Sequence, residues 1–367
     1  MGACRLITLA IHTYEKALAL KTILEREGVV AVLNNVNLAN PSISSGVRVR
    51  ISESDLPLAL RIVENPDVFK SNNQHSEELK TIIVPIDFSD YSYRACLVAF
   101  NIAKLHKAQL SIIYSYIGNY SIDNLRFNED YHQENEEANK NKINAKERMS
   151  QFSNKLIEQI KFGVIPPIRF TTTILEGVPE DSITEFAKQN KPLAIVMGTR
   201  GAGKKEKELV GSVTGEVLDS CRFPVLVVPE LVSSFEISRL KHLVFFCNFD
   251  NKDIIALDML YRLLPNISLD ITMVNIPNQT TKLVDPFFKQ KSEILKYCSN
   301  NYPRFNFKVN TLDIKDINKE FEFIKETPID LIIIPNKKKN VFARFFNPSL
   351  AHKILLHSDI PMMTIPI

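Results

Sequence analysis

Short apolar runs alternate with amphipathic stretches over most of this chain. Between residues 80 and 230 the apolar runs are rich in β-branched side chains, and the stretches between them repeat apolar positions at helical spacing. Strands that are apolar throughout are typical of a parallel sheet covered by helices on both faces. The pattern predicts an open α/β domain with strands at 81–86, 109–114, 168–174, 193–197 and 225–228 and helices at 91–106, 181–189 and 213–220.

The same order of elements returns in the last part of the chain. Residues 212–229 align without a gap on residues 349–366, so that the run Pro-Val-Leu-Val-Val-Pro lies over Pro-Met-Met-Thr-Ile-Pro. We therefore predict an internal duplication with tandem domains at 80–230 and 240–367. The second series has expected strands at 243–246, 269–274, 307–312, 331–334 and 362–365 and expected helices at 252–264, 317–325 and 350–358.

Residues 1–66 have a different pattern and are expected to form a small α+β domain. Its predicted strands are 6–11, 29–33 and 47–51, and its predicted helices are 14–27 and a segment starting at Asp55. The polar residues 67–79 are expected to be a linker. A charged insertion lies between Tyr116 and Ile165 in the first α/β domain, and its later part, 133–161, predicts a mostly solvated helix beside the sheet.

Glycine is distributed very unevenly along the chain. All 11 glycines precede residue 216, and Gly198, Gly201, Gly203, Gly211 and Gly215 lie in one stretch that follows a predicted strand. Glycine lets the backbone approach a ligand closely, and the stretch ends where a helix is expected to begin at Ser212. Because a helix N-terminus offers unpaired N–H groups and Ser212 and Thr214 can add hydroxyl donors, a phosphate is the expected occupant.

Two better-known phosphate motifs fit this stretch poorly. Gly198-x4-Gly203-Lys204 begins like a P-loop, but Lys205 stands where Ser or Thr would hold magnesium. No G-x-G-x-x-G follows a predicted strand, which argues against a dinucleotide fingerprint. The alternative without a ligand is that these glycines only shape a surface loop.

Three separated signatures in residues 80–230 fit a different family. They are Val84-Pro-Ile-Asp87-Phe-Ser89 at the first strand, Gly198-x2-Gly201-x9-Gly211-Ser212 after the fourth, and residues 224–229 at the last. In this order they resemble the ATP-binding branch of the universal stress protein family. The resemblance implies a Rossmann-type fold of the adenine nucleotide alpha hydrolase-like kind, with ATP, with or without Mg²⁺, lying across the strand ends.

The resemblance also implies roles for individual residues. The family usually has a valine near adenine at the end of the second strand, where this sequence has Ser115 or Tyr116. The implied adenosine side is Pro85, Asp87 and this position, the implied ribose and phosphate side is Met197 and Gly198, and the implied phosphate cradle is Gly201, Gly211, Ser212, Val213 and Thr214.

The second copy lacks the key residues of this motif. The replacements are Pro335 for Gly198, Lys338 for Gly201, Pro348 for Gly211 and Asn248 for Asp87, and only Ser349 keeps the identity of its counterpart. Since proline has no N–H to donate, we expect a degenerate universal stress domain that does not bind ATP in the same way.

The resemblance has further implications for assembly. Family members pair through their last strand, which implies that 225–228 and 362–365 pair within the chain as a pseudo-dimer, with a homo-oligomer left open. Residues 5–65 resemble a small bacterial signal-transducing domain with a ferredoxin-like half fold. No site residues follow from that second resemblance.

Composition narrows the classes of partner. The formal net charge is +3, with 45 Lys and Arg against 42 Asp and Glu, so the chain lacks the field of a dedicated nucleic-acid coat. The basic loop 337–344 contains phenylalanine, but we expect the phenylalanines to pack inward, the lysines to be solvated and nucleic acid not to be a partner. The five cysteines are far apart, which favours a reducing cytoplasm and no structural zinc, and the apolar runs are too short for a membrane span.

Catalysis would require a base, nucleophile or metal beside the phosphates, and the sequence places none there. We therefore expect a stress-response regulator that binds ATP and changes its contacts with an unidentified protein partner. A slow ATP hydrolase or nucleotidyl-transferring enzyme is the first alternative. A ligand-free interaction scaffold is the second.

Overall fold

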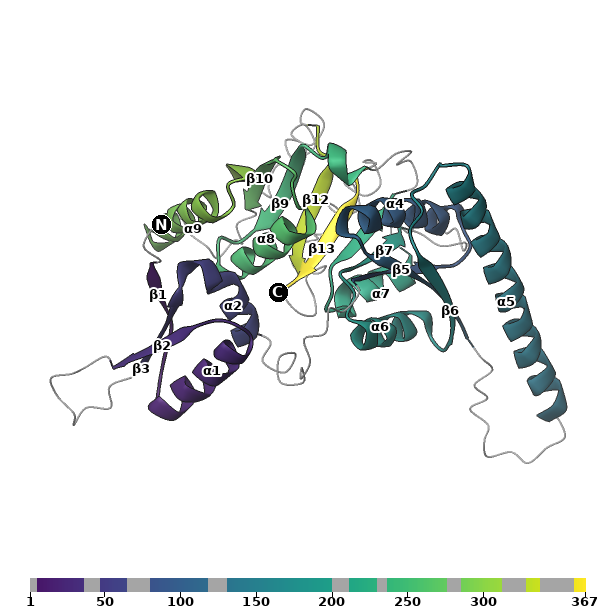
Figure 1. Cartoon of the computed structure of the whole chain (residues 1–367), viewed down its shortest axis with the longest axis horizontal. Helices are drawn as coiled ribbons and strands as arrows, with labels where there is room; N and C mark the ends of the chain where they lie inside the picture. Colours follow the sequence, from purple (N-terminus) through teal and green to yellow (C-terminus); the bar gives the residue numbers. More distant parts are fainter. Residues whose placement is uncertain are drawn as a thin grey trace.

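The computed structural model describes residues 5–35, 47–64, 80–117, 131–199, 211–229, 236–275, 285–311, 328–336 and 360–367. It contains a small sheet near the N-terminus and one large sheet to which both series of strands contribute (Figure 1). The predictions for Gly201, Lys338, Pro348 and Ser349, for the linker 67–79 and for the helices 317–325 and 350–358 lie outside the described residues.

The large sheet has ten strands. The first series is β4 (Thr81–Ile86), β5 (Gln109–Tyr116), β6 (Phe170–Glu176), β7 (Ala194–Gly198) and β8 (Val225–Val228), and the second is β9 (His242–Cys247), β10 (Leu269–Asn275), β11 (Phe305–Thr311), β12 (Leu331–Asn336) and β13 (Met362–Pro366). Their order is β11-β10-β9-β12-β13-β8-β7-β4-β5-β6. Neighbours are parallel within each half, and the halves meet where β8 and β13 pair antiparallel, with Leu226 opposite Met363.

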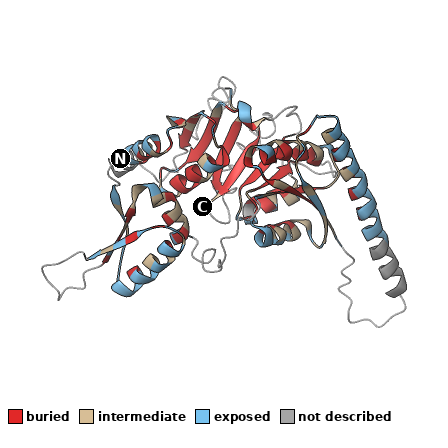
Figure 2. Cartoon of the chain, viewed as in Figure 1, coloured by how far each residue is buried: buried red, intermediate tan, exposed pale blue. Residues whose placement is uncertain are grey.

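Alternate strand residues face opposite sides of this sheet, and helices cover both sides. Ile82 and Val84 belong to a core shared with α4 (Asp90–His106), α5 (Tyr131–Lys161), α8 (Asn251–Leu263) and α9 (Asp285–Asn301). Ile83 belongs to a second core shared with α6 (Pro179–Asn190) and α7 (Ser212–Ser220). The inner strands are buried along most of their length (Figure 2), which confirms the two-sided burial that the apolar runs predict, whereas the edge strands β6 and β11 are partly exposed.

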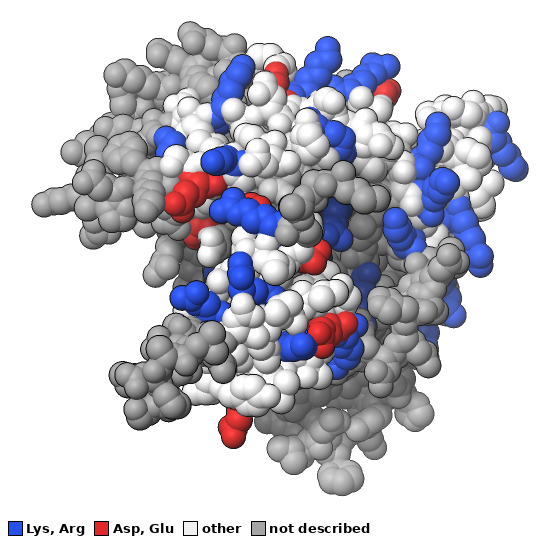
Figure 3. Space-filling view, turned by 60° about the vertical axis from the view of Figure 1, so that its left-hand side comes forward, with Lys and Arg blue, Asp and Glu red and all other residues white. Residues whose placement is uncertain are grey.

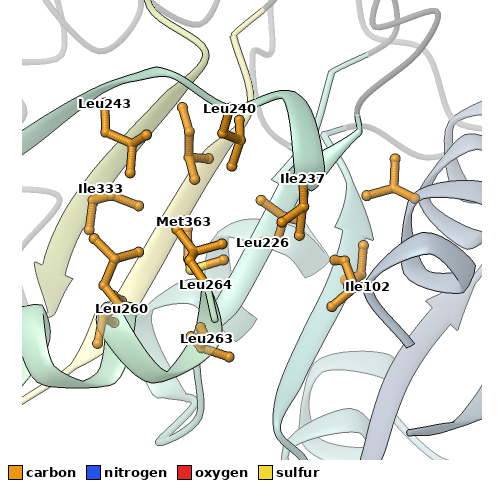
Figure 4. Close-up of a cluster of buried hydrophobic side chains, with 14 of the residues drawn as sticks. Ile102, Leu226, Ile237, Leu240, Leu243, Leu260, Leu263, Leu264, Ile333 and Met363 are labelled. Carbon is orange, nitrogen blue, oxygen red and sulfur yellow. The ribbon is translucent and has the colours of Figure 1, made fainter. Parts of the chain in front are cut away.

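The core is continuous across the junction of the two halves. Leu226 and Met363 lie beneath Ile237 and Leu240, which come from a short 3₁₀ segment, η2 (Ile237–Arg239), and its end (Figure 4). On the same face, the Nε2–H of His106 at the end of α4 donates to the carbonyl of Leu263 in α8 at 2.7 Å.

None of the helices in the described ranges combines the length and the apolar composition that a bilayer crossing requires.

Two helices require corrections to the sequence analysis. The sequence does not predict α9, and it presents α5 as an insertion. Both helices in fact connect the second strand of a half to the third, and these strands are parallel. Parallel neighbours need a crossover of about a dozen residues or more, so that requirement could have identified both. As expected, the described side chains of α5, from residue 140 on, are mostly exposed, and the buried ones among them are Ala145, Met149, Phe152 and Leu156.

The N-terminal part has its own small core. It contains β1 (Leu6–His12), β2 (Ala31–Asn35), β3 (Val47–Ser52), α1 (Tyr14–Arg26), a 3₁₀ turn η1 (Glu53–Asp55) and α2 (Leu56–Glu64). Both strand pairs are antiparallel, in the order β1-β3-β2. The predicted strand 29–33 is displaced to 31–35, because residues 27–30 are used to leave α1 through Gly28, whose φ is +85°.

This part is attached to the second half of the large sheet. In α2, Leu56 and Leu60 pack against the main core, and Glu64 forms an ion pair of 3.1 Å with Lys252 in α8. The hydroxyl of Tyr297 in α9 donates to the carbonyl of Glu53 at 3.3 Å. Figure 3 shows this side of the molecule, with Lys and Arg side chains spread over it and Asp and Glu between them.

Candidate functional site

Three neighbouring strands of the first half bring the predicted residues to one edge of the sheet. Asp87 directly follows β4, and the register Ile86 to Tyr114 puts Ser115 of β5 level with it. Gly198 ends β7, the other neighbour of β4. Ligands of open parallel sheets bind outside the carboxyl ends of the strands, and this is the edge where the structure places these residues.

The carboxylate of Asp87 organises the segment that follows β4. It accepts hydrogen bonds from the N–H of Ser89, at 3.1 Å, and from the Ser89 hydroxyl. Ser89 is the N-cap of α4, and its oxygen accepts from the N–H of Ser92 at 3.2 Å. Ser89 therefore caps α4, and Asp87 is not the helix cap.

Gly198 has a packing role that the sequence did not reveal. A Cβ built on Gly198 would lie 2.8 Å from the Cβ of Tyr91 and 3.0 Å from its carbonyl carbon, in the first turn of α4. The absence of a side chain thus lets the end of β7 approach α4. Contact with Tyr91 explains this glycine, whether or not a ligand also approaches it.

The start of α7 offers donors to the same edge. Gly211 is its N-cap with φ −58°, so this glycine does not need the left-handed conformation, and its own N–H donates to Thr199 O at 2.8 Å. Ser212 is exposed, and the first N–H groups of a helix have no acceptor within the helix. The end of β7 and the start of α7 therefore form one anion-compatible corner.

Thr214 requires a correction. The sequence suggests that its hydroxyl can donate to a phosphate, but the side chain is buried and donates to the carbonyl of Gly198 at 3.1 Å. This bond ties α7 to β7. Of the two hydroxyls that the sequence assigned to a phosphate, that of Thr214 is thus engaged within the protein, and Ser212 remains exposed.

The end of β5 is also fixed by a side chain. The Ser115 hydroxyl donates to the carbonyl of Gly177 at 3.0 Å, whereas the Tyr116 hydroxyl is directed to Glu176, on the edge strand β6. Of the two candidates for the position near adenine, Ser115 is the one level with Asp87. Pro85 and Met197 lie one strand position or more inside the edge, and Met197 is buried.

The second half presents different chemistry at the equivalent edge. Asp253 is fully buried, and its carboxylate accepts the N–H groups of Asn248 and Asp250, each at 3.0 Å. Asp250 in turn caps α8. Pro335 on β12, at the position of Gly198, has no N–H to offer, and the counterpart of the α7 start lies outside the described residues.

Sequence reasoning missed one repeated feature. Phe88 and Phe249 follow the first strand of each half and have positive φ values of 65° and 55°. The internal alignment pairs the two residues, but the sequence does not indicate their conformation, since a bulky residue rarely adopts it. Among the described residues, no group of His, Cys, Asp and Glu is arranged to hold a metal ion.

Comparison with known proteins gives matches that include this site. Residues 78–229 match the model of the universal stress protein family. The chain is 36% identical over 155 residues to a universal stress protein of Methanocaldococcus jannaschii, covering 41% of this chain and 81% of the relative. It is 30% identical over 151 residues to one of Thermus aquaticus, covering 41% and 98%.

Solved structures of the same description are also similar. The universal stress protein UspA from Lactobacillus plantarum shares 27% identity with a TM-score of 0.34, and the alignment covers 41% of this chain and 97% of that one. A universal stress protein in complex with cAMP shares 24% identity with a TM-score of 0.27, covering 42% and 98%.

Proposed function

This chain belongs to the universal stress protein family, and from that premise we propose that its first α/β half binds ATP at the edge formed by β4, β5 and β7. The observation that carries the proposal is the convergence of the α7 N-terminus with the carboxyl ends of these strands. Because its first-turn N–H groups and dipole favour negative charge, the triphosphate would lie against Ser212 and Val213.

The rest of the nucleotide would extend along the strand ends. Gly198 leaves the end of β7 without a side chain, and Asp87 and Ser115 lie level with each other on the next two strands. A carboxylate accepts hydrogen bonds from ribose hydroxyls or from an adenine amino group, which suits the adenosine side. Any Mg²⁺ would arrive bound to the phosphates.

In this proposal the protein is a stress-response regulator whose contacts depend on nucleotide occupancy. We also propose that the two halves are tandem universal stress domains forming a pseudo-dimer within the chain. The identical strand order of the halves and the pairing of β8 with β13 support this. The order β1-β3-β2 supports a ferredoxin-like half fold for the N-terminal domain. We propose that this domain transduces a signal and that the protein acts in the cytoplasm.

A single charge at Ser212 tests ATP binding. Ser212→Glu adds a carboxylate to the first turn of α7, which complements the helix dipole but repels a triphosphate. We expect at least about a tenfold loss of ATP affinity by isothermal titration, with thermal stability unchanged or slightly higher. Ser212→Gln is the matched neutral control and should keep most of the affinity. Equal affinity in the two variants would contradict the phosphate position.

Two further measurements separate the alternatives. Nucleotide released from the denatured, purified protein and detected by mass spectrometry would support the ligand, and its absence together with no ATP binding in titration would favour a ligand-free scaffold. Magnesium-dependent release of ADP, lost in Asp87→Ala, would instead favour a slow ATP hydrolase. The regulator proposal expects bound ATP without such turnover.

A further inference from the structure

Phe88 connects the candidate site to the long helix α5. It lies between Asp87 and Ser89, and its backbone has φ +65°. This conformation is unfavourable for a bulky residue and persists only where contacts with the surrounding structure offset its cost. Because Phe88 is covalently joined to Asp87, any shift of its ring is transmitted to the backbone that carries the Asp87 carboxylate.

The Phe88 ring is held from two directions. Its centroid is 4.5 Å from that of Tyr114 at the end of β5. From α5, the guanidinium of Arg148 lies 4.4 Å from the centroid, and the buried ring of Phe152 packs edge-on at 5.8 Å. The position of α5 and the position of Phe88 therefore depend on each other.

The second half repeats this arrangement with one difference. Phe249 also has a positive φ, and Lys291 of α9 lies 5.4 Å from its ring centroid. There, however, the loop N–H groups are held by Asp253, a carboxylate with no exposed surface. A ligand at the second edge would have no access to the group that fixes its phenylalanine.

In the first half, the group that fixes the loop is Asp87 itself, the carboxylate assigned to the ligand. The residue at the place of Asp253 is Ser92, which cannot supply a charge to the loop. Both hydrogen bonds from Ser89 go to Oδ1 of Asp87, so a nucleotide that binds Asp87 shares this carboxylate with the segment that carries Phe88. Ligand binding and the support of Phe88 thus use the same carboxylate.

We propose that Phe88 is a positioning residue through which α5 sets the nucleotide affinity of the first half, and through which occupancy alters the docking of α5. The inference rests on the proposed function. Coupling between two sites is reciprocal, so the factor by which α5 docking raises nucleotide affinity equals the factor by which the nucleotide favours α5 docking. Weakening the contact between α5 and Phe88 should therefore weaken nucleotide binding. A change in the docking of α5 then alters the position of its exposed outer face, which lies at the side of the sheet (Figures 1 and 2).

The test compares Arg148→Ala with Lys291→Ala, the equivalent change in the second half. We expect ATP affinity by isothermal titration to fall roughly three- to fivefold in Arg148→Ala, to stay at the wild-type value in Lys291→Ala and to recover largely in Arg148→Lys. Hydrogen exchange in residues 144–156 of the full chain should slow when ATP is added to wild type, and by more than exchange in α9, because a ligand that only stabilises the fold does not single out α5.

The outcomes separate the two proposals. If wild type binds no ATP, the proposed function fails and this inference fails with it. If wild type binds ATP but Arg148→Ala binds as tightly as Lys291→Ala, the coupling alone is overturned. Exchange in α5 that is the same with and without ATP also overturns it and leaves nucleotide binding intact.

Discussion

The substitution Gly198→Ala tests the packing at the floor of the candidate site. The added Cβ would lie 2.8 Å from the Cβ of Tyr91, about 0.6 Å short of the 3.4 Å at which ordinary contact begins. It would also lie 3.0 and 3.1 Å from the backbone carbon and oxygen of Tyr91, which cannot turn away as a side-chain tip can. Either β7 or the first turn of α4 must move.

Overpacking of this kind typically costs about 1–3 kcal/mol. At roughly 2–4 °C per kcal/mol for a cooperative unit of 150–250 residues, the melting temperature should fall by roughly 2–12 °C. The displaced turn adjoins the segment 87–89, so we also expect weaker ATP binding. Circular dichroism melting and ATP titration of the full chain measure the two effects.

Gly215→Ala is the matched control, since nothing lies within 4 Å of a Cβ added there. Gly215 is inside α7, where alanine is favoured over glycine by up to about 1 kcal/mol, so this variant should melt at or above the wild-type temperature. A Gly198→Ala variant as stable as Gly215→Ala would refute the close contact between β7 and α4 and, with it, the packing explanation of Gly198.

Two further predictions concern the contacts that join the parts of the chain. Burial holds the pKa of His106 below its ordinary value, so the unfolded chain takes up the proton first and stability falls as the pH drops below about 6.5. Urea unfolding between pH 7 and 5 should therefore lose up to about 1.4 kcal/mol per pH unit more in wild type than in His106→Gln, and equal slopes would contradict this. Asp258 is buried on α8, where it pairs with Arg262 at 2.8 Å and attracts Arg61 of α2. Asp258→Ala leaves Arg61 without this charge and should cost about 1–3 kcal/mol in urea unfolding, whereas a change below about 0.5 kcal/mol would argue against the attachment of α2.

Local pattern was sufficient for the strands of both series and for the edge that carries the candidate site. A strand buried on both faces must be apolar along its whole length, so its position is visible without its neighbours. The residue after such a strand in a parallel sheet must lie at the carboxyl edge, which places Asp87 there. The start of α7 at Ser212 was predicted for a similar local reason, because Gly211 and Ser212 follow the loop and precede an apolar periodic stretch.

Interactions between residues far apart in the chain were decided by tertiary structure alone. The contact of Gly198 with Tyr91, the hydrogen bond of Thr214 to Gly198 and the hold of α5 on Phe88 depend on which surfaces meet when the sheet closes. The attachment of α2 to α8 is of the same kind. Periodicity specifies which face of an element is apolar, but it does not specify the partner, because many apolar faces are compatible in composition and only their packed shapes select one.

The sequence by itself thus determined the parallel α/β architecture, the duplication as a pattern and the residues brought to one edge of the first half. The tertiary structure decided which contacts those residues make. Gly198 leaves room for α4, and the Thr214 hydroxyl joins α7 to β7. Asp87 restrains the segment after β4, and Asp253 restrains the equivalent segment after β9 in the second half. The physical reason is that residue type sets which bonds a group can make, while the distances that choose among those bonds exist only in the folded chain.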